Sequence, residues 1–159
     1  MNQVSVGIAD LAVGAGDLML VTMGLGSCVA IVLHDAETRI GALAHVLLPH
    51  VAHTATASSA GKVPSSAVPV MLQRMRDLGA TGEVQARLIG GASMFTPMLA
   101  QGAASMGARN VQACRLACVS HGIPIVGEAV GGERGRSVHF NVHSGRVDVR
   151  TVLGGDLVL

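Results

Sequence analysis

The chain has 159 residues, which predicts a single domain spanning 1–159 with room for a sizeable core. The formal net charge is +1 and the chain lacks Trp and Tyr, which argues against a nucleic-acid surface built on basic patches and aromatic stacking. We expect no secretory signal, because 1–14 (MNQVSVGIADLAVG) lacks a basic start followed by an apolar core, and no apolar run reaches the roughly 18 residues needed to span a bilayer. We therefore expect a cytoplasmic protein without membrane insertion, whose three cysteines are free thiols.

The first part of the chain is predicted to consist of strands. Loose alternation of apolar and polar residues predicts a strand over 4–13, and a second is expected over 17–22. An apolar, β-branched run predicts a buried strand over 28–33. The polar stretch 34–39 predicts a hairpin that leads into a fourth strand over 40–47.

The rest of the chain mixes helices and strands. The Ser-, Thr-, Ala-, His- and Pro-rich segment 49–66 predicts a long functional loop. Apolar spacing predicts a helix that begins near Ser65 or Ser66, keeps Pro69 in its first turn and ends at Gly79. The remaining predicted elements are a strand over 84–89, a helix over Ala108 to His121 capped by Gly122, and strands over 123–130, 137–142 and 146–153. Strands dominate and no βα unit repeats, which favours an α+β (mixed α/β) fold over a doubly wound one.

A cysteine stands where a glycine-rich turn runs into the third predicted strand. Counting outward from the hairpin turn places Cys28 opposite a residue close to His45 or Val46, so a thiol and an imidazole would meet across adjacent strands. Such an imidazole would lower the thiol pKa from about 8.5 and activate the sulfur as a nucleophile. The backbone around Gly26 and Ser27 would point amides at a developing oxyanion. The alternative is that Cys28 is a small core residue.

The histidines suggest a second alternative. His45, His50 and His53 lie close in sequence and, together with Cys28, form a candidate metal-ligand set. Their spacing is irregular and matches no established ligand signature. His50 and His53 fit solvated loop residues better.

Three further patterns predict structure rather than chemistry. Cys114 and Cys118 lie one helical turn apart on an apolar face, as small core residues do. The segment 131–136 (GGERGR) lacks the Lys-Ser/Thr ending of a phosphate-binding loop and predicts a turn with an exposed, partner-binding pair of arginines. Gly90 and Gly91 predict close approach of another backbone.

Two segments taken together, 22–28 (TMGLGSC) and 44–49 (AHVLLP), resemble the CheD family, the chemoreceptor glutamine deamidases of bacterial and archaeal chemotaxis. The resemblance continues in family order through 89–95 (IGGASMF), Gly107 with 109–111 (RNV), 131–136 and 140–141 (FN). It implies a layered sandwich of mixed β-sheets with two to three helices packed outside.

The same resemblance implies an activity and a site. Cys28 would be the nucleophile, His45 the base and Thr22 the residue that orients the imidazole, with no metal and no cofactor. The substrates would be glutamine side chains of methyl-accepting chemotaxis receptors, and a CheC-type phosphatase would be a further partner. A non-catalytic adaptor that binds receptors or such a phosphatase is the alternative, and a metal-dependent hydrolase is a third.

The chain departs from the family pattern at two places. Lys62 is followed by 63–66 (VPSS), where family members usually add an aromatic residue and an Asp. Ala108 stands where the family often has Glu. Neither departure touches Thr22, Cys28 or His45, so they concern receptor docking or partner binding.

Overall fold

A computed structural model of the chain describes residues 1–51, 59–93 and 105–159. Its elements, in chain order, are β1 (Asn2–Ser5), β2 (Leu11–Ala15), β3 (Leu18–Leu25), β4 (Val29–Asp35), β5 (Ile40–Val46), α1 (Pro64–Asp77), β6 (Val84–Gly90), α2 (Met106–Ser120), β7 (Ile125–Val130), β8 (Arg136–Asn141), β9 (Val147–Thr151) and β10 (Leu157–Val158).

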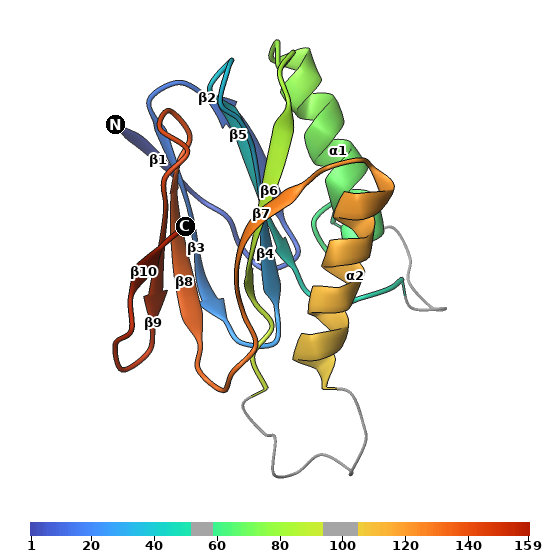
Figure 1. Cartoon of the computed structure of the whole chain (residues 1–159), viewed down its shortest axis with the longest axis vertical. Helices are drawn as coiled ribbons and strands as arrows, with labels where there is room; N and C mark the ends of the chain where they lie inside the picture. Colours follow the sequence, from blue (N-terminus) through green and yellow to red (C-terminus); the bar gives the residue numbers. More distant parts are fainter. Residues whose placement is uncertain (52–58, 94–104) are drawn as a thin grey trace.

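The strands form two five-stranded sheets that pack face to face. One sheet has the order β1-β3-β8-β9-β10 and the other the order β2-β5-β4-β6-β7. Figure 1 shows that α1 and α2 cover the outer face of the second sheet, so the layers run sheet, sheet, helices. The predicted α+β layered sandwich is confirmed.

The central strand β4 contributes to a core on each of its faces, because successive side chains of a strand point to opposite sides. Val29, Ile31 and Leu33 pack against the helices. Ala30 and Val32 instead join the core between the two sheets. Every residue of β4 and β5 is buried, which makes this pair the centre of the fold.

The predicted strand over 4–13 is wrong as a single element. It divides into β1 and β2, which belong to different sheets. The chain turns between them: Ala9 adopts a φ of 65°, and the Asp10 N–H donates to Gly7 O at 3.1 Å. Alternation of side chains could not reveal this turn, because Gly7 and Asp10 continue the pattern of a half-buried strand.

Both predicted helices are present, with shifted starts. α1 begins at Pro64, so Pro69 lies in the second turn rather than the first. Because Pro69 has no N–H, the carbonyl of Ser65 lacks its helical hydrogen bond, and Ser65 is exposed to water, which can replace that bond. α2 begins at Met106 and ends next to Gly122, which has a φ of 68° as the predicted cap requires. Part of the predicted loop over 49–66 lies outside the described residues.

Candidate active site

The β4–β5 hairpin puts Cys28 and His45 on the same face of their sheet. Its register pairs Val29 with Val46 and Ala30 with His45. Cys28 precedes Val29, so it lies one residue beyond Val46 in this register, close to the predicted position near His45 or Val46 but diagonal to His45. Cys28 shares the inter-sheet core with Ala30, whose side chain is directly across from His45. The predicted neighbourhood of the thiol and the imidazole is therefore a diagonal cross-strand one. Diagonal neighbours of this kind are close enough for long side chains to interact.

The opposite sheet supplies a partner for the imidazole. Thr22, on β3, lies 2.7 Å from Nδ1 of His45 through its Oγ1, and both residues are only 1 % exposed. The hydroxyl donates its single hydrogen to the carbonyl of Val6, also at 2.7 Å. Oγ1 must therefore accept from Nδ1–H of His45. The structure thus brings Thr22 and His45 together across the sandwich.

This hydrogen bond decides which tautomer the histidine adopts. With the proton on Nδ1, the neutral ring of His45 carries a free lone pair on Nε2. Nε2 is buried and has no hydrogen-bond partner among the described residues. A buried acceptor without a partner lowers the stability of the fold, so its presence suggests a functional role. The geometry thus leaves an unpaired proton acceptor on the sheet face that also carries Cys28.

The predicted lowering of the Cys28 pKa is wrong. Burial raises the pKa of the Cys28 thiol, although a hydrogen bond from its own backbone opposes the rise. Burial also lowers the pKa of His45. Both directions favour a neutral thiol beside a neutral imidazole, because a partly desolvated site disfavours charge. The thiol therefore needs a base to become a thiolate.

The segment that leads into β4 is held by its carbonyl groups. Gly26 O accepts from the Ala92 N–H and Cys28 O from the Gly91 N–H, each at 2.8 Å. Between them, Ser27 O accepts from Nδ2 of Asn110 at 2.9 Å. Three successive carbonyls are thus fixed by groups from the end of β6 and from α2.

The backbone N–H groups near the Cys28 turn differ in whether they are already hydrogen-bonded within the turn. The Gly26 N–H donates to Gly24 O at 3.1 Å, and Gly24 has a φ of 70°. Gly26 therefore supports the tight turn rather than offering a free amide. The backbone of Cys28 lowers the pKa of its own thiol, against the larger effect of burial, which indicates that this amide lies near the sulfur.

Close approach of backbones at Gly90 and Gly91 is confirmed. A Cβ on Gly90 would collide with Cys28 O, and one on Gly91 would collide with the side chain of Val111. Gly107 at the start of α2 is equally crowded, since a Cβ there would lie 2.5 Å from Ala92 O. The helix and β6 can therefore both press against the Cys28 turn only because these positions lack side chains.

Asn110 is the residue that reasoning from the sequence missed as part of the site. It is 0 % exposed, and its Nδ2 also donates to Leu47 O at 3.1 Å. The available signal was its position: a polar side chain one turn before Cys114 on the buried face of a helix. A buried amide at such a place needs partners, and here they flank Cys28 and His45.

The histidine metal set is not assembled in the described part of the chain. His45 is buried with Nδ1 bonded to Thr22, whereas His50 is exposed. His53 lies outside the described residues. Within those residues no group of three His, Cys, Asp or Glu side chains is arranged to hold a metal ion.

The other singled-out residues are structural. Cys114 and Cys118 are fully buried in the core under the helices, and burial raises the pKa of Cys118 to about 11. The predicted exposed arginine pair is half wrong. Arg134 is exposed, but Arg136 donates to Gly90 O at 3.2 Å and to Gly131 O at 2.8 Å and so pins the turn.

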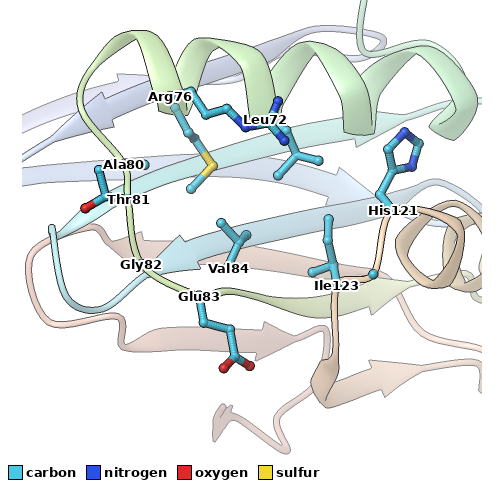
Figure 2. Close-up of a pocket in the computed structure, with 11 residues that line it drawn as sticks. Leu72, Arg76, Ala80, Thr81, Gly82, Glu83, Val84, His121 and Ile123 are labelled. Atoms are coloured by element: carbon cyan, nitrogen blue, oxygen red, sulfur yellow. The ribbon is translucent and has the colours of Figure 1, made fainter.

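Two cavities differ in their relation to this site. Figure 2 shows one of about 340 Å³ where α1 ends and β6 begins, with Arg76, Glu83 and His121 among its lining residues and none of the site residues. Another, of about 490 Å³, is lined by Met23 and Arg150, among others, beside the turn that precedes Cys28. Of these two cavities, the second lies nearer in the chain to Cys28, since Gly24 and Gly26 line it, although Cys28, His45 and Thr22 do not.

Known proteins resemble the chain over nearly its whole length. The family model described as CheD chemotactic sensory transduction matches residues 47–151, a range that begins after His45. A probable chemoreceptor glutamine deamidase CheD 2 of Geobacter metallireducens is 43 % identical over 94 % of this chain and 93 % of its own. The chemoreceptor glutamine deamidase CheD of Thermotoga maritima is 38 % identical over 95 % and 93 %, respectively. A probable chemoreceptor glutamine deamidase CheD of Pyrococcus abyssi is 36 % identical over 99 % and 96 %.

None of the helices in the described ranges is long and apolar enough to cross a membrane. The expected resemblance is confirmed, and the chain belongs to the CheD family.

Proposed function

We propose that this chain is a cysteine-dependent protein-glutamine deamidase that converts glutamine side chains of methyl-accepting chemotaxis receptors to glutamate and releases ammonia. The names of its relatives support the reaction and the substrate class. The observation that carries the proposal is the Thr22–His45 hydrogen bond, which leaves Nε2 free on the sheet face that holds Cys28.

In the first half of the reaction, Nε2 of His45 takes the thiol proton as the sulfur of Cys28 attacks the side-chain carbonyl carbon of the glutamine. A C–S bond forms and the carbonyl π electrons move to the oxygen. The backbone amide of Cys28 donates to that oxyanion. When the oxyanion collapses, the C–N bond breaks and His45 returns the proton to the leaving nitrogen, which departs as ammonia.

In the second half, a water molecule hydrolyses the thioester. His45 Nε2 accepts a proton from the water as its oxygen bonds to the thioester carbon. The C–S bond then breaks and the sulfur recovers the proton from His45. The product is a glutamate side chain, and Thr22 keeps the Nδ1 proton of His45 in place throughout, while Nε2 takes up and releases protons.

The proposal includes a place of action and a second partner. A reduced Cys28 is required, which fits the cytoplasm, and the described cysteines are free thiols. The mechanism uses no metal and no cofactor. Binding of a CheC-type phosphatase stays a prediction, which co-purification with such a protein would check.

The test is incubation of the purified protein with receptor signalling domains, followed by peptide mass spectrometry of each glutamine. We expect conversion of amide to acid at defined positions, undiminished by a chelator. Receptor that binds the protein but keeps every glutamine intact would favour the adaptor alternative. Activity lost on chelation and regained with a metal would favour the metal-dependent hydrolase.

A further inference from the structure

We propose that Asn110 is a positioning residue that directs the backbone amide of Cys28 at the oxyanion formed during deamidation. The inference rests on the proposed function and extends it to a residue on α2, outside the set Cys28, His45 and Thr22.

The first support is how the Asn110 amide is used. Its Nδ2 has two hydrogens and donates to two backbone carbonyls, Ser27 O at 2.9 Å and Leu47 O at 3.1 Å. One carbonyl directly precedes Cys28, and the other lies two residues after His45. A single side chain therefore ties the entry to β4 to the exit from β5, next to both groups of the proposed chemistry.

The second support is the rigidity of the peptide unit. The carbonyl of Ser27 and the N–H of Cys28 belong to one planar trans peptide, in which they point in opposite directions. Fixing Ser27 O on Asn110 therefore fixes the direction of the Cys28 N–H. The neighbouring units cannot rotate to compensate, because Ala92 and Gly91 hold the carbonyls of Gly26 and Cys28.

The amide so fixed belongs to the residue whose sulfur would attack, so a carbonyl bonded to that sulfur would lie close to the Cys28 N–H. A hydrogen bond from the Cys28 backbone, which opposes the rise of the thiol pKa, fits this placement. The Gly26 N–H is already committed to Gly24 O. The Cys28 amide is therefore the donor that we assign to the negative oxygen. A donor whose direction is fixed before the reaction stabilises the oxyanion most effectively.

Asn110 holds the two carbonyls at the cost of one unpaired buried oxygen. The side chain is fully buried, and its Oδ1 has no hydrogen-bond partner among the described residues. An apolar side chain of the same shape would avoid the cost of the unpaired Oδ1 but would leave the carbonyls of Ser27 and Leu47 without their donor. The helix that carries it is pressed against Gly91 and Ala92 through the bare Cα of Gly107, so the amide cannot shift away from Ser27.

The experiment compares Asn110→Ala and the near-isosteric, apolar Asn110→Leu with wild type. Cys114→Ala is the matched control, because Cys114 is equally buried one turn along the same helix face. Three quantities are measured for each folded variant: kcat and KM for receptor deamidation, the rate of Cys28 alkylation by iodoacetamide, and the affinity for a peptide aldehyde derived from glutamine. The aldehyde forms a tetrahedral adduct with the thiol and needs the oxyanion donor, whereas alkylation develops no such charge.

We expect both Asn110 variants to lose about 10- to 100-fold in kcat and a similar factor in aldehyde affinity, somewhat less than removing a donor outright. KM, Cys28 alkylation and the Cys114→Ala control should stay within about threefold of wild type. An unchanged kcat in a folded Asn110 variant would overturn the proposal, as would alkylation that falls in step with deamidation. Failure of wild type itself to convert receptor would instead overturn the proposed function.

Discussion

The hydroxyl of Thr22 determines the tautomer of His45, so substitution of Thr22 tests this assignment directly. Its hydroxyl accepts from Nδ1–H of His45 and donates to Val6 O, both at 2.7 Å. Thr22→Val keeps the shape of the side chain and removes the hydroxyl. Two buried polar groups then lose their partner, and the ring of His45 is free to carry its proton on Nε2, where it cannot act as a base.

The size of the effect follows from those two groups. An unpaired buried donor or acceptor costs about 1–3 kcal/mol, so the two groups together should cost the variant about 2–6 kcal/mol of stability. At about 2–4 °C per kcal/mol for a chain of this size, the Tm should fall by about 4–24 °C. General-base catalysis contributes about 10²–10⁴, and partial loss of the correct tautomer should lower kcat about 10- to 100-fold.

Thr22→Ser is the matched control, because it retains the oxygen and removes only a methyl group. Deamidation of receptor is followed by peptide mass spectrometry, and the Tm by circular dichroism. We expect Thr22→Ser to stay within about threefold of wild-type kcat. The reasoning would be refuted by a folded Thr22→Val with wild-type kcat, or by a Thr22→Ser that loses as much as Thr22→Val.

Three further predictions concern protons and thiols. Near pH 7, limiting iodoacetamide should label Cys28, which is 8 % exposed, well before Cys114 and Cys118, which are 0 % exposed. Labelling of Cys28 should be slower in His45→Ala than in wild type, and equal labelling of the three thiols would contradict the prediction. Burial holds the pKa of His45 below 6.5, so kcat should persist through pH 6.5 and fall only in more acidic buffer, and a loss already at pH 7 would count against the neutral base. Burial lowers the pKa values of both His34 and His45, so below pH 6.5 the unfolded chain binds more protons than the folded one; the free energy of unfolding should therefore decrease as the pH falls, and a constant value from pH 7 to 5 would contradict the burial of these rings.

Much of the fold could be predicted from the sequence, because its signals are local. The polar stretch 34–39 between two apolar runs indicated the β4–β5 hairpin, and Gly122 indicated the end of α2. The split of 4–13 into two sheets could not be predicted, since it depends on which long-range partner each half finds. β10 was missed because two residues, Leu157–Val158, carry no periodicity.

The candidate site divides in the same way. The hairpin alone indicated that Cys28 and His45 would be neighbours, and counting residues missed the register only slightly. Thr22 reaches His45 from the other sheet, so no spacing in the sequence could predict the contact; it was expected only from the family resemblance. The direction of the Cys28 pKa was predicted wrongly because desolvation, a property of the packed core, outweighs what a neighbouring imidazole was expected to do.

The central claim is that receptor glutamines are hydrolysed through the sulfur of Cys28. The measurement that tests it most directly is the kcat of Cys28→Ala on purified receptor domain, read by mass spectrometry after its fold has been verified by circular dichroism. Members of a nucleophile and base pair act as a unit, so we expect a loss of several orders of magnitude, with conversion indistinguishable from receptor alone. Conversion by Cys28→Ala at a rate near that of wild type would contradict the account.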